Sequence, residues 1–208
     1  MAKILLVNGS PDSKGCTAAA LNEMVGIFDS EGMDSEIVTV GSLELPGCSG
    51  CRYCRDSGKC VHDDIVNDFA AKLEKADALV VGSPVYYASP NGTLISFLDR
   101  LFFSAKYSMQ MKVGAAVVSC RRAGSTAALD VLNKYFTISG MAVASGTYWN
   151  QVHGFTPEDV AKDEEGLQTV RNLARNIVFM VRAISDAKEK YGLPPMEHDA
   201  FTSFHDGK

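Results

Sequence analysis

The chain has 208 residues, 46% of them hydrophobic and 22% charged, so we expect one globular domain with its own core. Its formal net charge of −5 argues against nucleic acid or an anionic membrane surface as the main partner, because both require clustered positive charge. Six cysteines are too few for a disulfide scaffold in a chain of this length.

Residues 1–10 contain one lysine and an apolar run of four residues, which is too short for a secretory signal. No stretch approaches the ~18 consecutive apolar residues that a membrane-spanning helix requires. We therefore expect a cytoplasmic protein without a membrane partner. Thiols stay reduced in that compartment, so clustered cysteines indicate metal binding or catalysis.

Short apolar runs alternate with segments of helical periodicity along the chain. Residues 3–7 predict a buried strand, and residues 17–30 predict a helix because apolar side chains recur every three or four positions. The last helix begins after Thr156 and ends before Gly192, and Gly166 is expected to break or kink it. The other predicted strands are 37–40, 78–81, 113–119 and 141–146, and the other predicted helices are 63–75, 91–103 and 126–138.

This alternation predicts an open parallel sheet with helices on both faces. In such sheets, ligands bind in the loops beyond the carboxyl ends of the strands. We expect a single domain over residues 1–195 with a cysteine-rich loop at 47–62, followed by a polar, loosely held tail at 196–208.

The loop after the first strand, residues 9–17 (GSPDSKGCT), combines hydroxyls and glycines with a helix amino terminus, which favours an anion. It is neither a Walker A loop nor a dinucleotide fingerprint, so a single phosphate monoester fits best. The alternative is an ordinary polar turn that caps the helix. The predicted phosphate-binding residues are Ser10, Ser13, Lys14, Gly15, Cys16 and Thr17.

The loop after the third strand, residues 82–92 (GSPVYYASPNG), has two adjacent tyrosines and two prolines that order it. It would form a wall for a flat heterocycle, and the alternative is that the tyrosines only pack the end of the sheet. The two loops together fit the phosphate and the ring of FMN. The predicted ring-binding residues are Pro84, Val85, Tyr86, Tyr87, Ser89, Asn91 and Gly92, with Ser119 and Arg121 from the loop after the fourth strand.

Four of the six cysteines have the spacing C-x2-C-x2-C-x5-C, with three basic residues between them. This spacing resembles the ferredoxin-type run, whose thiolates hold a cubane cluster. Thiols without a metal, reduced or paired as disulfides, and a zinc site are the alternatives. Cys16 and Cys120 are isolated in the sequence and are expected to be packing or pocket residues. The predicted metal ligands are Cys48, Cys51, Cys54 and Cys60.

Other residues of interest lie in the third helix and after the fifth strand. We expect Asp99–Arg100 to form a structural ion pair or an interface contact. Trp149 is expected to cap the flavin pocket or to lie at a dimer seam, and His153 to make a structural hydrogen bond.

The segments GSPDSKGCT and GSPVYYASPNGTLISFLDR, with the cysteine run before Asp63–Asp64, resemble the NADPH-dependent FMN reductase family of flavodoxin-like proteins. The cysteine run is similar to that of its iron–sulfur flavoprotein branch. The resemblance covers about residues 3–150. It implies a flavodoxin-like three-layer α/β sandwich whose five-stranded parallel sheet has the order 2-1-3-4-5. It also implies non-covalent FMN, a 4Fe–4S cluster on the four cysteines, and a homodimer or homotetramer with flavin sites near subunit interfaces.

Two positions depart from the family pattern, which commonly has Arg in place of Asp12 and Asn in place of Cys16. An acid beside a phosphate is unfavourable. We therefore expect Asp12 to point away from the phosphate or to weaken its binding.

The expected function is that of an FMN-dependent oxidoreductase with NAD(P)H or a ferredoxin-type carrier as electron donor and a small molecule as acceptor. A cluster would pass electrons singly between FMN and a partner. The redox chemistry belongs to the flavin, so no catalytic side chain is assigned. The alternatives are a cluster-free quinone, nitro or azo reductase and a ferredoxin-linked electron-transfer flavoprotein without a small-molecule substrate. A redox sensor whose cysteine run switches between thiol and disulfide is a further alternative.

Overall fold

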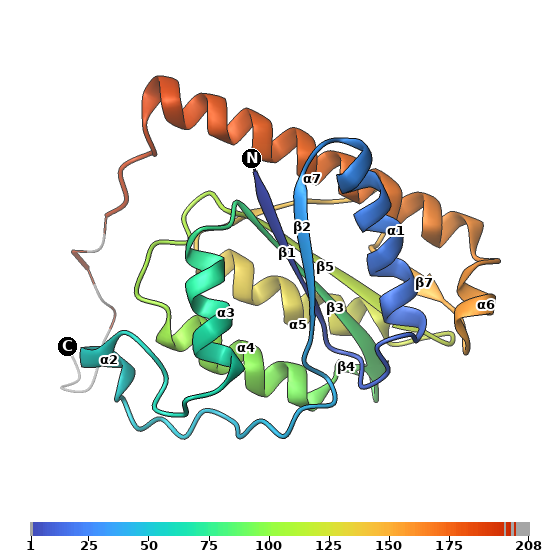
Figure 1. The fold of residues 1–208 in the computed structure, drawn as a ribbon, viewed down its shortest axis with the longest axis horizontal. Coiled ribbons are helices and arrows are strands. Elements are labelled where there is room, and N and C mark those ends of the chain that lie inside the picture. Colours follow the sequence, from blue (N-terminus) through green and yellow to red (C-terminus); the bar gives the residue numbers. More distant parts are fainter. Residues whose placement is uncertain (1, 198, 201, 203–208) are drawn as a thin grey trace.

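The computed structural model describes residues 2–197, 199–200 and 202, and these form a parallel sheet with helices on both faces (Figure 1). The main strands have the order β2-β1-β3-β5-β6, which corresponds to the expected 2-1-3-4-5 order of flavodoxin-like sheets. The fold prediction is therefore confirmed. The five strands are β1 (Lys3–Asn8), β2 (Asp34–Thr39), β3 (Ala78–Tyr86), β5 (Val113–Cys120) and β6 (Ala142–Val143).

Two short strands extend the sheet at the carboxyl ends of β3 and β5. β7 (Gln151–His153) pairs in parallel with the end of β5, whereas β6 pairs with the start of β5, so the fifth strand position is shared by two segments. β4 (Ser89–Pro90) folds back antiparallel to the end of β3. Both short strands therefore lie where ligands of parallel sheets bind.

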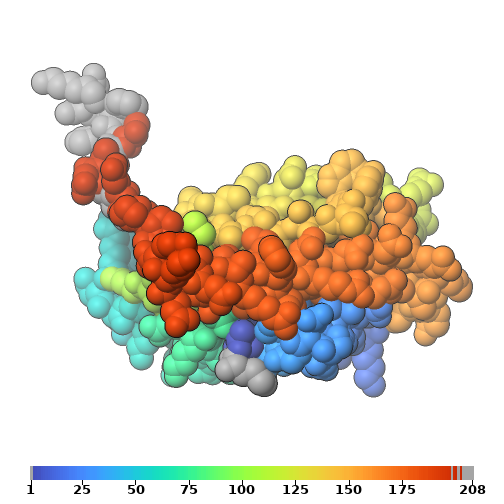
Figure 2. Space-filling view, turned by 90° about the horizontal axis from the view of Figure 1, so that it is seen from above, coloured from blue at the N-terminus to red at the C-terminus, as the bar shows by residue number. Residues whose placement is uncertain are grey.

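The helices divide between the two faces of the sheet (Figure 1). One face is covered by α1 (Cys16–Ser30) and α7 (Glu164–Tyr191), and α7 runs along the length of the molecule (Figure 2). The other face is covered by three helices: α3 (Ile65–Glu74), α4 (Gly92–Ser104) and α5 (Ser125–Ile138). Strand β1 has both faces covered, because Ile4 and Leu6 contact the first layer while Leu5 and Val7 contact the second. This burial explains its continuous apolar run.

The predicted last helix is two helices, so the expectation that Gly166 breaks it is wrong. The first is α6 (Pro157–Val160), which Thr156 caps, and the second is α7, which Asp163 caps by accepting from the Gly166 N–H at 3.0 Å. Gly166 thus lies in the first turn of α7, where a Cβ would overlap the Asp163 carboxylate.

A short helix, α2 (Cys54–Ser57), lies inside the cysteine-rich loop and was not predicted. Of the predicted tail at 196–208, residues 198, 201 and 203–208 lie outside the described residues, and the others are exposed. Within the described ranges, no helix combines the length and apolar character needed to cross a bilayer.

Candidate functional site

An open cleft with a volume of about 300 Å³ lies at the carboxyl ends of β1, β3 and β5. Its walls come from the loops predicted to bind FMN, because parallel strands end at the same edge of the sheet. The predicted residues that line it are Ser10, Gly15, Cys16, Thr17, Pro84, Val85, Tyr86, Ser119 and Arg121.

The other predicted cofactor residues are absent from the lining of this cleft. Tyr87 and Ala88 form the tip of the β3–β4 hairpin with φ of 50° and 60°, and the Tyr87 side chain is fully exposed. Asn91 is buried, but its Oδ1 accepts from the Thr93 N–H at 2.7 Å and caps α4. The hairpin turn therefore leaves Tyr87 in solvent, and the helix cap holds Asn91 in another contact. The predicted residues outside the lining are Ser13, Lys14, Tyr87, Ser89, Asn91 and Gly92.

The amino terminus of α1 opens on the cleft without a side-chain cap. Gly15 is the N-cap residue, and within the described part of the chain no other residue accepts a hydrogen bond from the backbone N–H groups of Cys16 and Thr17. Free N–H groups and the helix dipole together favour an anion at this position. The Thr17 and Ser119 hydroxyl oxygens lie 2.8 Å apart and join the loops after β1 and β5. This end of the cleft fits a phosphate.

Asp12 lies against this same loop and lines the cleft, so the alternative that it points away is wrong, and the alternative that it weakens phosphate binding stays a prediction. Its Oδ1 accepts from the Lys14 N–H at 2.8 Å, and its Oδ2 would lie 3.1 Å from a Cβ built on Gly15. The Asp12 N–H in turn donates to the Ser10 hydroxyl at 3.2 Å. The carboxylate therefore already accepts from one backbone donor of the phosphate loop.

Besides Asp12, three cleft residues were not assigned to the cofactor from the sequence, namely Cys120, Gly154 and Phe155. The Gly154 N–H donates to the Cys120 carbonyl at 3.1 Å, and the Gly154 carbonyl accepts from the Cys16 thiol at 3.7 Å. The position of Gly154 depends on the pairing of β7 with β5, and no local sequence pattern predicts that pairing.

Both thiols of the cleft have pKa values above the ordinary value. Burial raises the pKa of the Cys120 thiol. Burial also raises the pKa of the Cys16 thiol, and the negative charges of Asp159, Asp12 and Glu158 raise it further. At neutral pH both groups are therefore protonated thiols.

In reduced protein without bound iron, we expect iodoacetamide to modify Cys48 and Cys51 before Cys16 and Cys120. The first pair is exposed, whereas the raised pKa of the second pair lowers the fraction of reactive thiolate. Timed labelling at about pH 8 followed by peptide mass spectrometry checks this order. Urea-unfolded protein is the control, in which these four cysteines should react at similar rates. Faster labelling of Cys120 than of Cys48 in folded protein would contradict the prediction.

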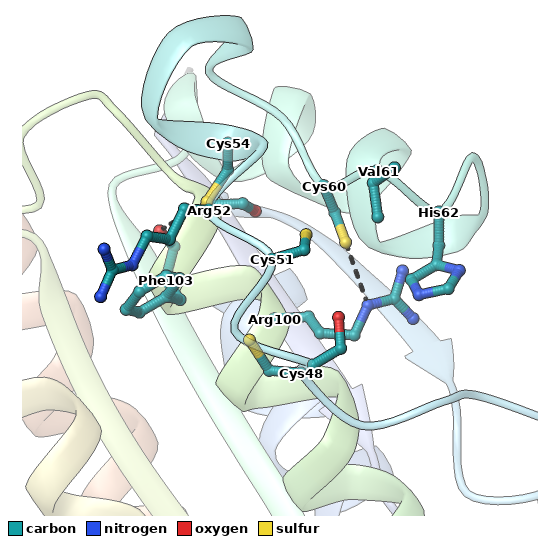
Figure 3. A pocket seen from close by; sticks show the side chains of 11 residues that line it. Cys48, Cys51, Arg52, Cys54, Cys60, Val61, His62, Arg100 and Phe103 are labelled. Carbon is teal, nitrogen blue, oxygen red and sulfur yellow. Dashed lines mark hydrogen bonds between the residues drawn. The ribbon is translucent and has the colours of Figure 1, made fainter.

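The four cysteines of the run line a second pocket, between their own loop and the carboxyl-terminal part of α4 (Figure 3). Cys48 and Cys51 are exposed, and the Cys54 thiol donates to the Phe103 carbonyl at 3.7 Å. Across the described residues, the side chains do not meet in a ready-made metal-ligand arrangement of three or more groups. The run thus brings four sulfurs to one pocket without placing them in ligand geometry.

Arg100 is a buried charged residue of this cysteine pocket, and only 1% of its surface is exposed. Its guanidinium donates to Cys60 Sγ at 3.2 Å (Figure 3), to Asp64 Oδ1 at 2.9 Å and to the Pro46 carbonyl at 3.4 Å. Burial opposes the charged form, but these hydrogen bonds to Cys60 and Asp64 outweigh it and raise the pKa of Arg100. The ion pair of Arg100 is therefore with Asp64.

The four thiols that line the cysteine pocket are the type of ligand that an iron–sulfur cluster takes. Such clusters take thiolate ligands and are anionic, so a buried guanidinium offsets part of their charge. The cysteine pocket and the cleft share no lining residue. The cysteine pocket lies at the carboxyl-terminal end of α4, where Arg100, Phe103 and Ser104 line it.

Comparison with known proteins gives matches over most of the chain. The model of the NADPH-dependent FMN reductase family matches residues 2–156. An iron–sulfur flavoprotein of Methanocaldococcus jannaschii is 30% identical over 190 residues, which cover 88% of this chain and 98% of that protein. An iron–sulfur flavoprotein of Methanosarcina thermophila is 26% identical, covering 90% of this chain and 100% of that protein. The solved structure of RosB with a bound 8-demethyl-8-formylriboflavin-5′-phosphate intermediate superposes with a TM-score of 0.73 at 15% identity. The superposition covers 100% of this chain and 99% of that chain, and it supports the fold alone.

Proposed function

Because this chain belongs to the NADPH-dependent FMN reductase family, we propose that it is an FMN-dependent oxidoreductase that accepts electrons from NAD(P)H. We further propose that a 4Fe–4S cluster on the four cysteines of the run passes electrons between FMN and an acceptor. When bound, FMN would supply hydride acceptance and one-electron or two-electron transfer.

The observation that carries the flavin proposal is the cleft at the carboxyl ends of β1, β3 and β5. The backbone N–H groups at the start of α1 would hold the phosphate, with the Thr17 and Ser119 hydroxyls beside them. Pro84 and Tyr86 would form the wall for the ring. Arg121 also lines the cleft, and its positive charge would attract a negatively charged edge of the flavin or of the nicotinamide cofactor.

The cluster proposal is supported by the chemistry of the cysteine pocket. Four thiols line it, a buried guanidinium donates to one of them, and the curated relatives above carry the name iron–sulfur flavoprotein. Arg100 would hold Cys60 in place and offset the negative charge of bound thiolates.

Anaerobic purification and reconstitution with iron and sulfide, followed by cofactor analysis and stopped-flow reduction, test both proposals. We expect one FMN and about four irons per chain, with flavin reduction by NADPH or NADH. Less than about one iron per chain would leave a cluster-free reductase. Reduction by ferredoxin but by neither nicotinamide would indicate an electron-transfer flavoprotein. Failure to bind FMN would overturn the flavin proposal.

A further inference from the structure

Acidic side chains lie around the phosphate end of the cleft. Asp12 comes from the phosphate loop and lines the cleft, while Glu158 and Asp159 come from the first turn of α6. All three carboxylates lie close enough to Cys16 to raise the pKa of its thiol. Three acids from two elements thus converge on the residue that begins α1.

Nearby cations only partly offset the charge of these carboxylates. A hydrogen bond from the Thr156 hydroxyl lowers the pKa of Glu158, and the Phe155 N–H does the same for Asp159. Lys162 Nζ lies 3.3 Å from Asp159 Oδ1, and among the three acids Asp159 is its ion-pair partner. Arg121, which follows β5, is the cation that lines the cleft itself.

Asp12 acts on the phosphate position most directly. Its carboxylate accepts from the Lys14 N–H at 2.8 Å, so a phosphate at this loop would meet a donor already taken and a negative charge beside it. If the carboxylate stays, it repels the phosphate. If it turns outward, the Lys14 N–H exchanges one anionic acceptor for another. In both cases the Lys14 N–H adds little net binding free energy for a phosphate, and the charge of Asp12 offsets part of what the N–H groups of Cys16 and Thr17 contribute.

We propose that Asp12 is a specificity-determining residue that removes most of the contribution of the phosphate to flavin binding. The cleft then binds FMN and riboflavin with similar affinity. This inference rests on the proposed flavin function. It assigns the ring wall around Pro84 and Tyr86 the larger share of the affinity.

Flavin fluorescence quenching on the wild-type protein and on Asp12→Asn tests the inference, with FMN and riboflavin as the two probes. Asparagine keeps an acceptor for the Lys14 N–H and removes the charge. The control variant is Asp186→Asn, an exposed acid in the carboxyl-terminal part of α7. We expect wild-type Kd values for the two flavins to agree within about threefold. Asp12→Asn should tighten FMN binding about tenfold and change riboflavin binding by less than about twofold.

Ionic strength supplies a second readout. Added salt screens repulsion, so wild-type FMN binding should tighten as salt increases, opposite to the behaviour of a basic phosphate site. An FMN preference above about a hundredfold in the wild type, or an unchanged FMN-to-riboflavin ratio in Asp12→Asn, would overturn the inference alone. Binding of neither flavin to any of the three proteins would instead overturn the proposed function and the inference with it.

Discussion

Replacing Arg100 by methionine should destabilise the apoprotein by about 3–5 kcal/mol and prevent the cysteine pocket from retaining iron. Arg100 is buried and donates to Cys60, Asp64 and Pro46, so the substitution leaves three acceptors without their shared donor. Arg100 is buried and its partner Asp64 is only partly exposed, so removing Arg100 costs more than removing one member of a fully exposed ion pair. Urea denaturation and iron analysis after anaerobic reconstitution measure the two effects.

Two further variants separate the charge of Arg100 from its geometry. Arg55→Met removes an exposed cation of the same loop and should change stability by less than about 0.5 kcal/mol. Arg100→Lys keeps the charge but cannot make the forked contacts to Cys60 and Asp64, so it should recover only part of the stability. An Arg100→Met protein within about 1 kcal/mol of wild type would show that the buried network contributes little.

The contacts of Arg100 with Cys60, Asp64 and Pro46 could not be predicted from local sequence patterns. The strands were predictable because both faces of a parallel sheet are buried and their segments read as apolar runs. The cysteine run was predictable from its spacing. The contact between Arg100 and Cys60 joins residues 40 positions apart, and whether Arg100 would pair with Cys60, with Asp64 or with a neighbour depends on how α4 packs. No periodicity encodes that packing.

The cleft also combines features that the sequence predicted with features that it did not. Its three loops were predictable because each follows a strand of one parallel sheet. Gly154 and Phe155 were missed because they enter through β7, a three-residue strand too short to give a pattern. The direction of Asp12 was also missed, since a carboxylate can turn toward its own loop or toward solvent with the same sequence.

Gly41→Ala is the substitution expected to disturb the cleft most without touching a cofactor-binding side chain. Gly41 follows β2, and a Cβ built there would overlap the backbone of Gly9 and Ser10, where the phosphate loop begins. Backbone cannot rotate away as a flexible side chain does, so the loop itself must move. We expect a loss of about 3 kcal/mol in the free energy of unfolding. We also expect at least tenfold weaker binding of both FMN and riboflavin, because the start of α1 shifts relative to the ring wall.

Gly26→Ala is the matched control for the Gly41 variant. A Cβ built on Gly26 meets nothing within 4 Å, and this glycine lies inside α1, whose amino terminus is the phosphate end of the cleft. Alanine there should stabilise the protein by roughly 0.5–1 kcal/mol and leave flavin binding unchanged. Chemical denaturation and flavin titration of the two variants make the comparison. If Gly41→Ala were as stable as wild type and bound flavin equally well, the close approach of the two loops would not be what shapes the cleft.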